Sequence, residues 1–153
     1  MAFYQFQKEQ FIKSTIDTVW AFISTPQNLK KITPDYMGFD IQSQDLPNKI
    51  YEGMIIAYKV KPLLGIKTTW VTEITHIKDK SYFVDEQRVG PYALWHHQHL
   101  IIPQADGVLM RDIVSYKPPF GLIGSLANSL IINTKLNEIF EYRKAVIEKL
   151  LQE

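Results

Sequence analysis

The final third of the chain constrains the fold more than any other segment, because its apolar residues recur at steps of three and four. From about residue 120 to residue 151, polar side chains such as Asn137 and Glu141 fall between the apolar ones, which indicates a long amphipathic helix. The apolar positions are Leu122, Leu126, Leu130, Leu136, Ile139, Phe140, Ile147 and Leu150. A helix with such a stripe is not stable alone in water, so the rest of the chain has to cover it.

The segments that precede this helix are mainly typical of strands. The sequence predicts a first strand over residues 3–16, two short helices over 17–24 and 26–31, and then a run of strands. These later strands are expected at residues 39–44, 54–60, 66–77, 81–88, 90–103 and 108–117. We therefore predict one α+β domain over residues 1–153. In it, a curved antiparallel sheet of about six or seven strands wraps around the long C-terminal helix.

Composition excludes several classes of function. The chain has 153 residues, no cysteine and a formal net charge of +1, with Lys and Arg spread along its length. The absence of cysteine excludes disulfides and cysteine-ligated zinc, and the dispersed charge argues against a nucleic-acid partner. The first residues lack the pattern of a signal peptide, and no apolar run approaches the roughly 20 residues that span a bilayer. We expect a cytoplasmic protein without stable membrane insertion.

Three of the four histidines lie in one predicted strand, the segment GPYALWHHQHLIIP at residues 90–103. Side chains alternate between the two faces of a strand, so Trp95, His97 and His99 share one face. A row of titratable rings on one face of a sheet suits the wall of a ligand cavity. The parity of the strand does not say which of its faces is concave.

The segment that follows predicts a hairpin. Residues 104–107 form its loop, in which Gly107 is able to adopt a positive φ. A four-residue loop pairs His99 with Asp112, His97 with Val114 and Trp95 with Tyr116. A five-residue loop would instead bring Arg111 opposite His99. The first register places a carboxylate beside an imidazole.

Such a pair supports more than one interpretation. A carboxylate raises the pKa of a neighbouring imidazole and fixes its tautomer, so Asp112 with His97 or His99 is a candidate general base. The alternatives are a structural His–Asp pair and a solvated outer face. The two histidines are also candidate zinc or iron ligands, with a third ligand from Asp85, Glu86 or Asp112. Because the sequence has no wider metal-binding signature, we predict no metal ion and no cofactor.

Short motifs across nearly the whole chain, in order, resemble one protein superfamily. They are Thr25-Pro26-x-Asn28-Leu29, Ile32-Thr33-Pro34, Met37-Gly38-Phe39, Glu52-Gly53-Met54, Trp70-x-Thr72-Glu73-Ile74, Phe83-Val84-Asp85-Glu86-Gln87, Gly90-Pro91-Tyr92, Trp95-His96-His97-x-His99, Asp112-x-Val114-x-Tyr116, Pro119-Phe120-Gly121 and Ile139-Phe140-x-Tyr142-Arg143. With the predicted order of elements, the chain resembles the START/polyketide-cyclase-like (SRPBCC, helix-grip) superfamily. Within it, the chain is similar to an uncharacterised bacterial ligand-binding branch.

The resemblance implies a cavity between the sheet and the C-terminal helix that holds a small hydrophobic molecule, either lipid-like or aromatic, without a cofactor. The residues that we expect to contact it are Tyr58, Trp70, Asp85, Trp95, His97, His99, Tyr116, Leu126, Leu130 and Phe140. Gln87 shares the face of Asp85 and is a further polar candidate. Arg143, late in the helix, could reach a carboxylate of the ligand or of Asp112, although arginines on helices are usually solvated.

Two other functions stay open. The first is an enzyme of the cyclase, dehydratase or hydrolase type that uses His97 or His99 with Asp112. The second is a protein-interaction module, which would have a filled interior and an exposed apolar patch.

Overall fold

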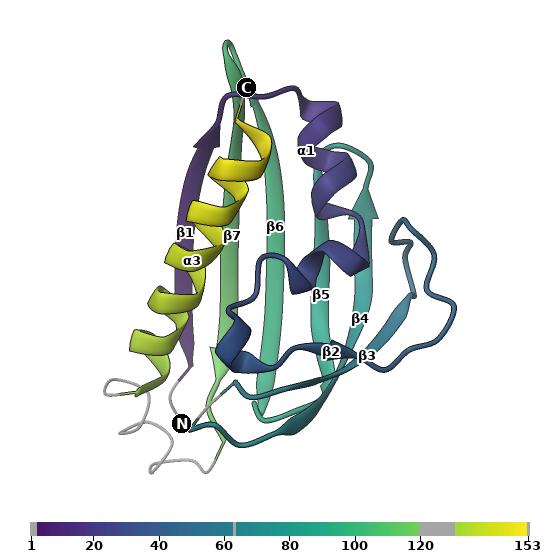
Figure 1. Cartoon of the computed structure of the whole chain (residues 1–153), viewed down its shortest axis with the longest axis vertical. Coiled ribbons are helices and arrows are strands. Elements are labelled where there is room, and N and C mark those ends of the chain that lie inside the picture. The colour runs from purple at the N-terminus through teal and green to yellow at the C-terminus, as the bar shows by residue number, and fades with distance from the viewer. Residues whose placement is uncertain (1–2, 63, 120–130, 153) are drawn as a thin grey trace.

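The structure, a computed structural model, describes residues 3–62, 64–119 and 131–152 (Figure 1). Within these ranges, seven strands form one antiparallel sheet in the order β1-β7-β6-β5-β4-β3-β2. The strands are β1 (Tyr4–Ile12), β2 (Asp40–Ile41), β3 (Ile55–Val60), β4 (Thr68–Lys78), β5 (Tyr82–Val89), β6 (Leu94–Gln104) and β7 (Gly107–Lys117). The predicted α+β class and the antiparallel meander are confirmed.

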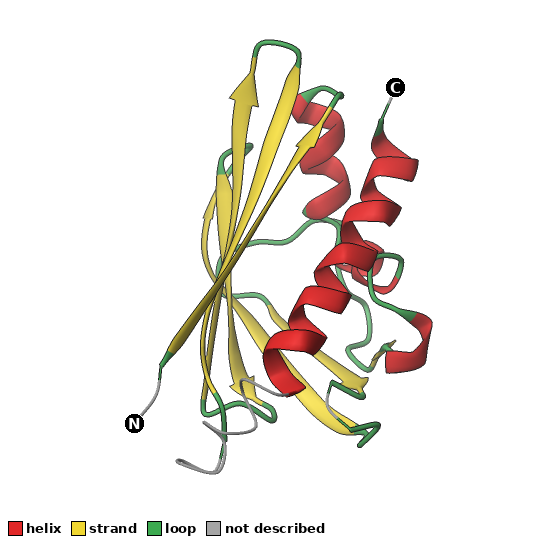
Figure 2. Ribbon diagram, turned by 90° about the vertical axis from the view of Figure 1, so that its left-hand side faces the viewer, coloured by secondary structure: helices red, strands yellow, loops and turns green. Residues whose placement is uncertain are grey.

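The helices of the described chain lie on one side of this sheet (Figure 2). They are α1 (Ile16–Ile23), two short 3₁₀ helices (Pro26–Lys30 and Asp35–Met37) and α3 (Asn133–Leu151). The first strand ends at Ile12 rather than at residue 16, because the chain turns at residues 13–14 and Thr15 is the N-cap of helix α1. The backbone N–H of Thr18 donates to the hydroxyl oxygen of Thr15 at 3.1 Å, which caps the N-terminus of α1.

The expected strand over residues 39–44 is much shorter in the structure. The backbone N–H groups of Gln42 and Ser43 both donate to the carbonyl oxygen of Ala57, at 2.8 and 3.2 Å. Two residues therefore oppose one, as in a β-bulge, and regular pairing stops after Ile41.

Helix α3 packs its apolar stripe on the sheet beside β1. Leu136, Phe140, Ile147 and Leu151 are buried, and the ring centroids of Phe6 and Phe140 are 5.0 Å apart. The expected stripe is confirmed at 136, 139, 140 and 147, whereas Leu150 is 50% exposed and Leu151 is buried in its place. The earlier positions at 120–130 lie outside the described residues. Among the described helices, none has both the length and the apolar character that crossing a bilayer requires.

The β6–β7 hairpin has the predicted register. His99 lies opposite Asp112, His97 opposite Val114 and Trp95 opposite Tyr116, and Gln104 pairs with Gly107 across the turn. Gly107 does not use its ability to adopt a positive φ in this turn. A Cβ on Gly107 would come 2.3 Å from the carbonyl oxygen of Ile12, so the glycine serves the close approach of β1 to β7.

Candidate functional site

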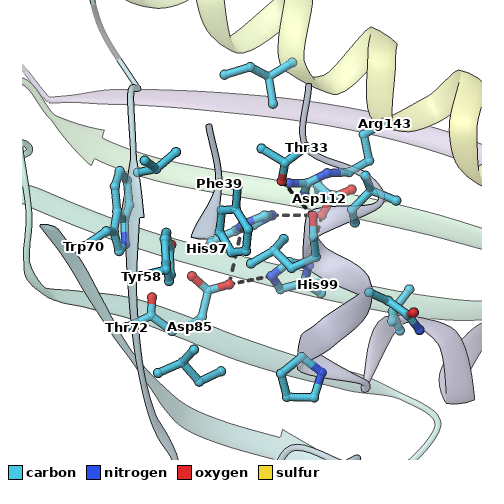
Figure 3. Close-up of a pocket in the computed structure, with 18 of the residues that line it drawn as sticks. Thr33, Phe39, Tyr58, Trp70, Thr72, Asp85, His97, His99, Asp112 and Arg143 are labelled. Carbon is cyan, nitrogen blue, oxygen red and sulfur yellow. Dashed lines mark hydrogen bonds and ion pairs between the residues drawn. The ribbon is translucent and has the colours of Figure 1, made fainter. Parts of the chain in front are cut away.

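A cavity of about 170 Å³ lies between the sheet and the helices that cover it (Figure 3). Strands β3 to β7 form one wall, and α1, the 3₁₀ helices and α3 form the other. From α3, the lining side chains are Lys135, Leu136, Ile139, Phe140, Arg143 and Ile147. The interior is therefore hollow, which departs from the filled interior that an interaction module would have.

Aromatic rings make up much of the sheet wall. The rings of Tyr58 and Trp70 stack with centroids 6.1 Å apart and an interplanar angle of 12°. Trp95 contacts Trp70 edge to face with ring centroids 5.3 Å apart, and the ring centroids of Phe39 and Tyr58 are 4.6 Å apart. These rings contact one another and present several flat aromatic faces, set at different angles, to the cavity.

Four titratable groups from three adjacent strands meet in the same wall (Figure 3). Asp85 comes from β5, His97 and His99 from β6, and Asp112 from β7. Asp85 lies opposite His97, yet its Oδ2 is closest to His99 Nε2, at 2.6 Å. Asp112 lies opposite His99, yet its Oδ1 is closest to His97 Nε2, at 2.8 Å. Each carboxylate therefore bonds most closely to the imidazole diagonal to it.

Two longer contacts close this arrangement into a ring. His99 Nδ1 is 3.2 Å from Asp112 Oδ1, and His97 Nδ1 is 3.6 Å from Asp85 Oδ2. The two imidazoles lie with their centroids 3.7 Å apart and their planes tilted by 32°, and the ring of Phe83 stacks on His99 with a centroid distance of 4.0 Å. We call these four groups, Asp85, His97, His99 and Asp112, the His–Asp cluster.

The cluster sets opposite protonation states for its two histidines. Burial acts to lower the pKa of His99, but the hydrogen bonds to Asp112 and Asp85 outweigh it, so that pKa is raised. Burial and the neighbouring charge of His99 lower the pKa of His97 in spite of its hydrogen bond to Asp112. Because His99 lies between two carboxylates, at 2.6 Å from Asp85 and 3.2 Å from Asp112, we expect it to take up a proton more readily than His97. A neutral His97 that donates from Nε2 to Asp112 has its lone pair on Nδ1.

Both carboxylates remain ionised although they are buried. Burial alone would raise the pKa of Asp112, but hydrogen bonds from His97 and His99 bring it well below its usual range. Burial acts on Asp85 in the same way, but its interactions with His97, His99 and Arg143 lower its pKa. Two carboxylates against one imidazolium leave one negative charge in the cluster, which requires a further cation nearby.

Arg143 supplies that charge from α3. It continues the helix stripe of Leu136, Phe140 and Ile147 and lines the cavity, with its guanidinium carbon 4.7 Å from the Phe140 ring centroid. Its Nε is buried and has no hydrogen-bond partner among the described residues, and the same is true of Trp70 Nε1. The cavity thus contains two N–H donors that are not satisfied by the described protein atoms.

The structure brings most of the predicted cavity residues together. Those that line the cavity are Tyr58, Trp70, Asp85, Trp95, His97, His99 and Phe140. Tyr116 is 2% exposed and is not among the lining residues; it packs against Tyr4, Tyr92 and Trp95. Leu126 and Leu130 lie outside the described residues.

Two polar candidates point elsewhere. The amide of Gln87 forms hydrogen bonds with the backbone N–H and carbonyl of Tyr92, at 3.1 and 2.7 Å. Gly90 permits this, because a Cβ there would lie 2.4 Å from Gln87 Oε1. Glu86 accepts from His96 Nδ1 at 2.6 Å on the opposite face of the sheet, so it is separated from the His–Asp cluster.

The sequence left two positions open for Arg143, with solvent preferred, and the structure places it in the cavity wall. The signal was present, since Arg143 falls three residues after Phe140 and four before Ile147, within the apolar stripe. A charged residue at a position that periodicity assigns to the interior indicates a buried partner or a ligand.

No protein-family model and no curated protein matches the sequence. Solved structures do match its fold. A START superfamily protein from Mycobacterium smegmatis has a TM-score of 0.70 at 11% identity, with 96% of each chain covered. A protein from Chromobacterium violaceum has a TM-score of 0.71 at 12% identity, over 97% of this chain and 98% of that one. Major latex-like protein 151 from Panax ginseng has a TM-score of 0.66 at 13% identity, with 96% of each chain covered.

The cluster predicts a pH optimum of stability. Unfolded histidines titrate near pH 6.5, so above about this value only folded His99, with its raised pKa, keeps its proton. Stability therefore falls as the pH rises through the pKa of His99. Below about pH 6.5 the unfolded chain protonates His97 and the folded one does not, so stability also falls with decreasing pH. Below about pH 4 the unfolded chain protonates its carboxylates, whereas folded Asp85 and Asp112, with their lowered pKa values, stay ionised. This difference reduces the stability further.

Denaturant unfolding between pH 4 and 9, with a chelator present, measures this profile. We expect a maximum near pH 6–7 and slopes of at most about 1.4 kcal/mol per pH unit for each proton. His99→Gln removes the decline on the alkaline side, whereas His76→Gln, at an exposed position, keeps it. An unchanged alkaline decline in His99→Gln would contradict the assigned charge of His99.

Proposed function

We propose that this chain, which has the helix-grip fold of START superfamily and major latex-like proteins, binds a small apolar molecule in the cavity between the sheet and α3. The supporting observation is the cavity itself, about 170 Å³ in a wall of mainly aromatic and aliphatic side chains. Protein interiors normally fill such space, and an apolar cavity of about 150 Å³ is large enough to bind benzene. A guest restores the dispersion contacts that the lining side chains lack.

The wall also favours one ligand chemistry. The flat surfaces of Tyr58, Trp70 and Trp95 suit an aromatic compound of one or two rings, and the volume disfavours a long-chain lipid. The unsatisfied N–H groups of Arg143 and Trp70 suit an oxygen acceptor on that compound. Because Asp85 and Asp112 face the same space, a phenol or ketone is a better fit than a carboxylate.

Calorimetric titration with 2-naphthol, a neutral aromatic probe with one hydroxyl, tests this proposal. Ile139→Trp places a bulky ring in the cavity wall and is expected to weaken binding at least tenfold. Leu150→Trp is the matched control, because Leu150 lies on the same helix, is 50% exposed and is absent from the cavity wall. Equal affinities for the two variants, or no binding of 2-naphthol or related one- and two-ring phenols to the wild type, would refute the proposal.

General-base catalysis on such a molecule is the second candidate function, favoured by the state of His97. A neutral imidazole whose Nε2–H is held by Asp112 has its Nδ1 lone pair free to accept a proton, and both groups line the cavity. This is the arrangement that a cyclase, dehydratase or hydrolase would use.

Hydrolysis of a 4-nitrophenyl ester tests the catalytic candidate. The rate is expected to rise with pH through the lowered pKa of His97, and to be lost in His97→Gln. His96→Gln, one residue along the strand and on the opposite face, keeps the rate. Turnover in His97→Gln equal to that of the wild type would eliminate His97 as the base.

A further inference from the structure

We propose that Asp85, His97 and His99 bind one divalent transition-metal ion, with Asp112 as the residue that positions both histidines. One carboxylate oxygen and one nitrogen of each imidazole lie within 4.8 Å of one another. All three residues line the cavity, and they come from the paired strands β5 and β6. This proposal does not depend on the binding of an apolar molecule.

The ligand atoms are spaced almost as a metal ion requires. Asp85 Oδ2 lies 2.6 Å from His99 Nε2 and 3.6 Å from His97 Nδ1. Zinc bonds of about 2.0–2.2 Å place neighbouring ligand atoms roughly 3–3.5 Å apart. A small outward shift of the Asp85 carboxylate reaches this spacing without a change of strand register. Two imidazoles and one carboxylate are a ligand set that zinc and iron(II) both accept.

The second carboxylate is arranged as an orienting group. Histidines that bind a metal ion usually donate their other ring N–H to a carboxylate or carbonyl, which fixes the ring and its tautomer. Asp112 Oδ1 lies 2.8 Å from His97 Nε2 and 3.2 Å from His99 Nδ1, which are the two ring nitrogens that do not face Asp85. One oxygen therefore holds both rings with their remaining nitrogens toward the proposed ion.

The charge of the site is compatible with a divalent ion, which would replace the proton of His99 as a ligand is bound through its nitrogen. With both imidazoles then neutral, the two carboxylates of the His–Asp cluster carry two negative charges in a mainly apolar wall, and one divalent cation balances both. The other His–carboxylate pair of the chain, His96 with Glu86, has only one imidazole and lies on the opposite, more exposed face. It therefore serves as an internal control.

Titration of the chelator-treated protein with Zn²⁺, and with Co²⁺ as a spectroscopic substitute, tests the site. We expect one ion per chain, with the visible absorption of Co²⁺ bound to nitrogen and oxygen ligands. His99→Ala and Asp85→Ala abolish this binding, and Asp112→Asn weakens it about 10–100-fold, as is usual for an orienting carboxylate. The double variant His76→Ala/His96→Ala retains wild-type affinity.

Circular dichroism establishes whether each variant is folded. If a cluster variant does not fold, the wild type still decides the question, because Co²⁺ then gives the large contact shifts of bound ligands at the ring protons of His97 and His99, and much smaller shifts at His76 and His96. The absence of one-to-one binding of either ion would overturn the proposal. So would retained binding in folded His99→Ala, loss of binding in the double variant, or paramagnetic shifts at His76 or His96 alone.

Discussion

The burial of two carboxylates in a mainly apolar wall is the constraint on which the rest of this site depends. Asp85 and Asp112 are tolerated there only because cations and N–H donors surround them. This requirement accounts for the two imidazoles on β6, for the opposite pKa shifts of His97 and His99, and for the guanidinium of Arg143 on the helix above. The same requirement makes the cluster either a self-neutralised proton network or, with a divalent ion, a metal site.

The geometry of the cluster depends in turn on strand register. A slip of one residue between β6 and β7 would bring Arg111 opposite His99 and turn the carboxylate of Asp112 to the other face. The tight turn between Gln104 and Gly107 prevents this, and Gly107 also lets β1 approach β7 closely. The curvature of the sheet then leaves the cavity between the cluster and α3. The strand register and the cavity together bring the polar groups of the cluster next to the proposed apolar ligand.

The sequence predicted the parts of this arrangement that depend on local patterns. Alternation placed Trp95, His97 and His99 on one face, and the short loop predicted Asp112 opposite His99. The concave face could not be predicted, because both faces of β6 carry a histidine beside a carboxylate and only the packing of α3 distinguishes them. The bond from Asp85 to His99 could not be predicted either, since it is diagonal and follows the irregular connection at residues 90–93. For Arg143 solvent was preferred over the cavity, because its charge was given more weight than its position in the stripe.

The protonation of the two imidazoles is the most direct test of this account. Nitrogen-15 NMR of the histidine rings, at pH 7 with a chelator present, reads the state of each nitrogen separately. The account predicts that His99 carries protons on both nitrogens and that His97 carries one, on Nε2. A neutral His99, or a second imidazolium at His97, would contradict the claim that the buried carboxylates are balanced in this way.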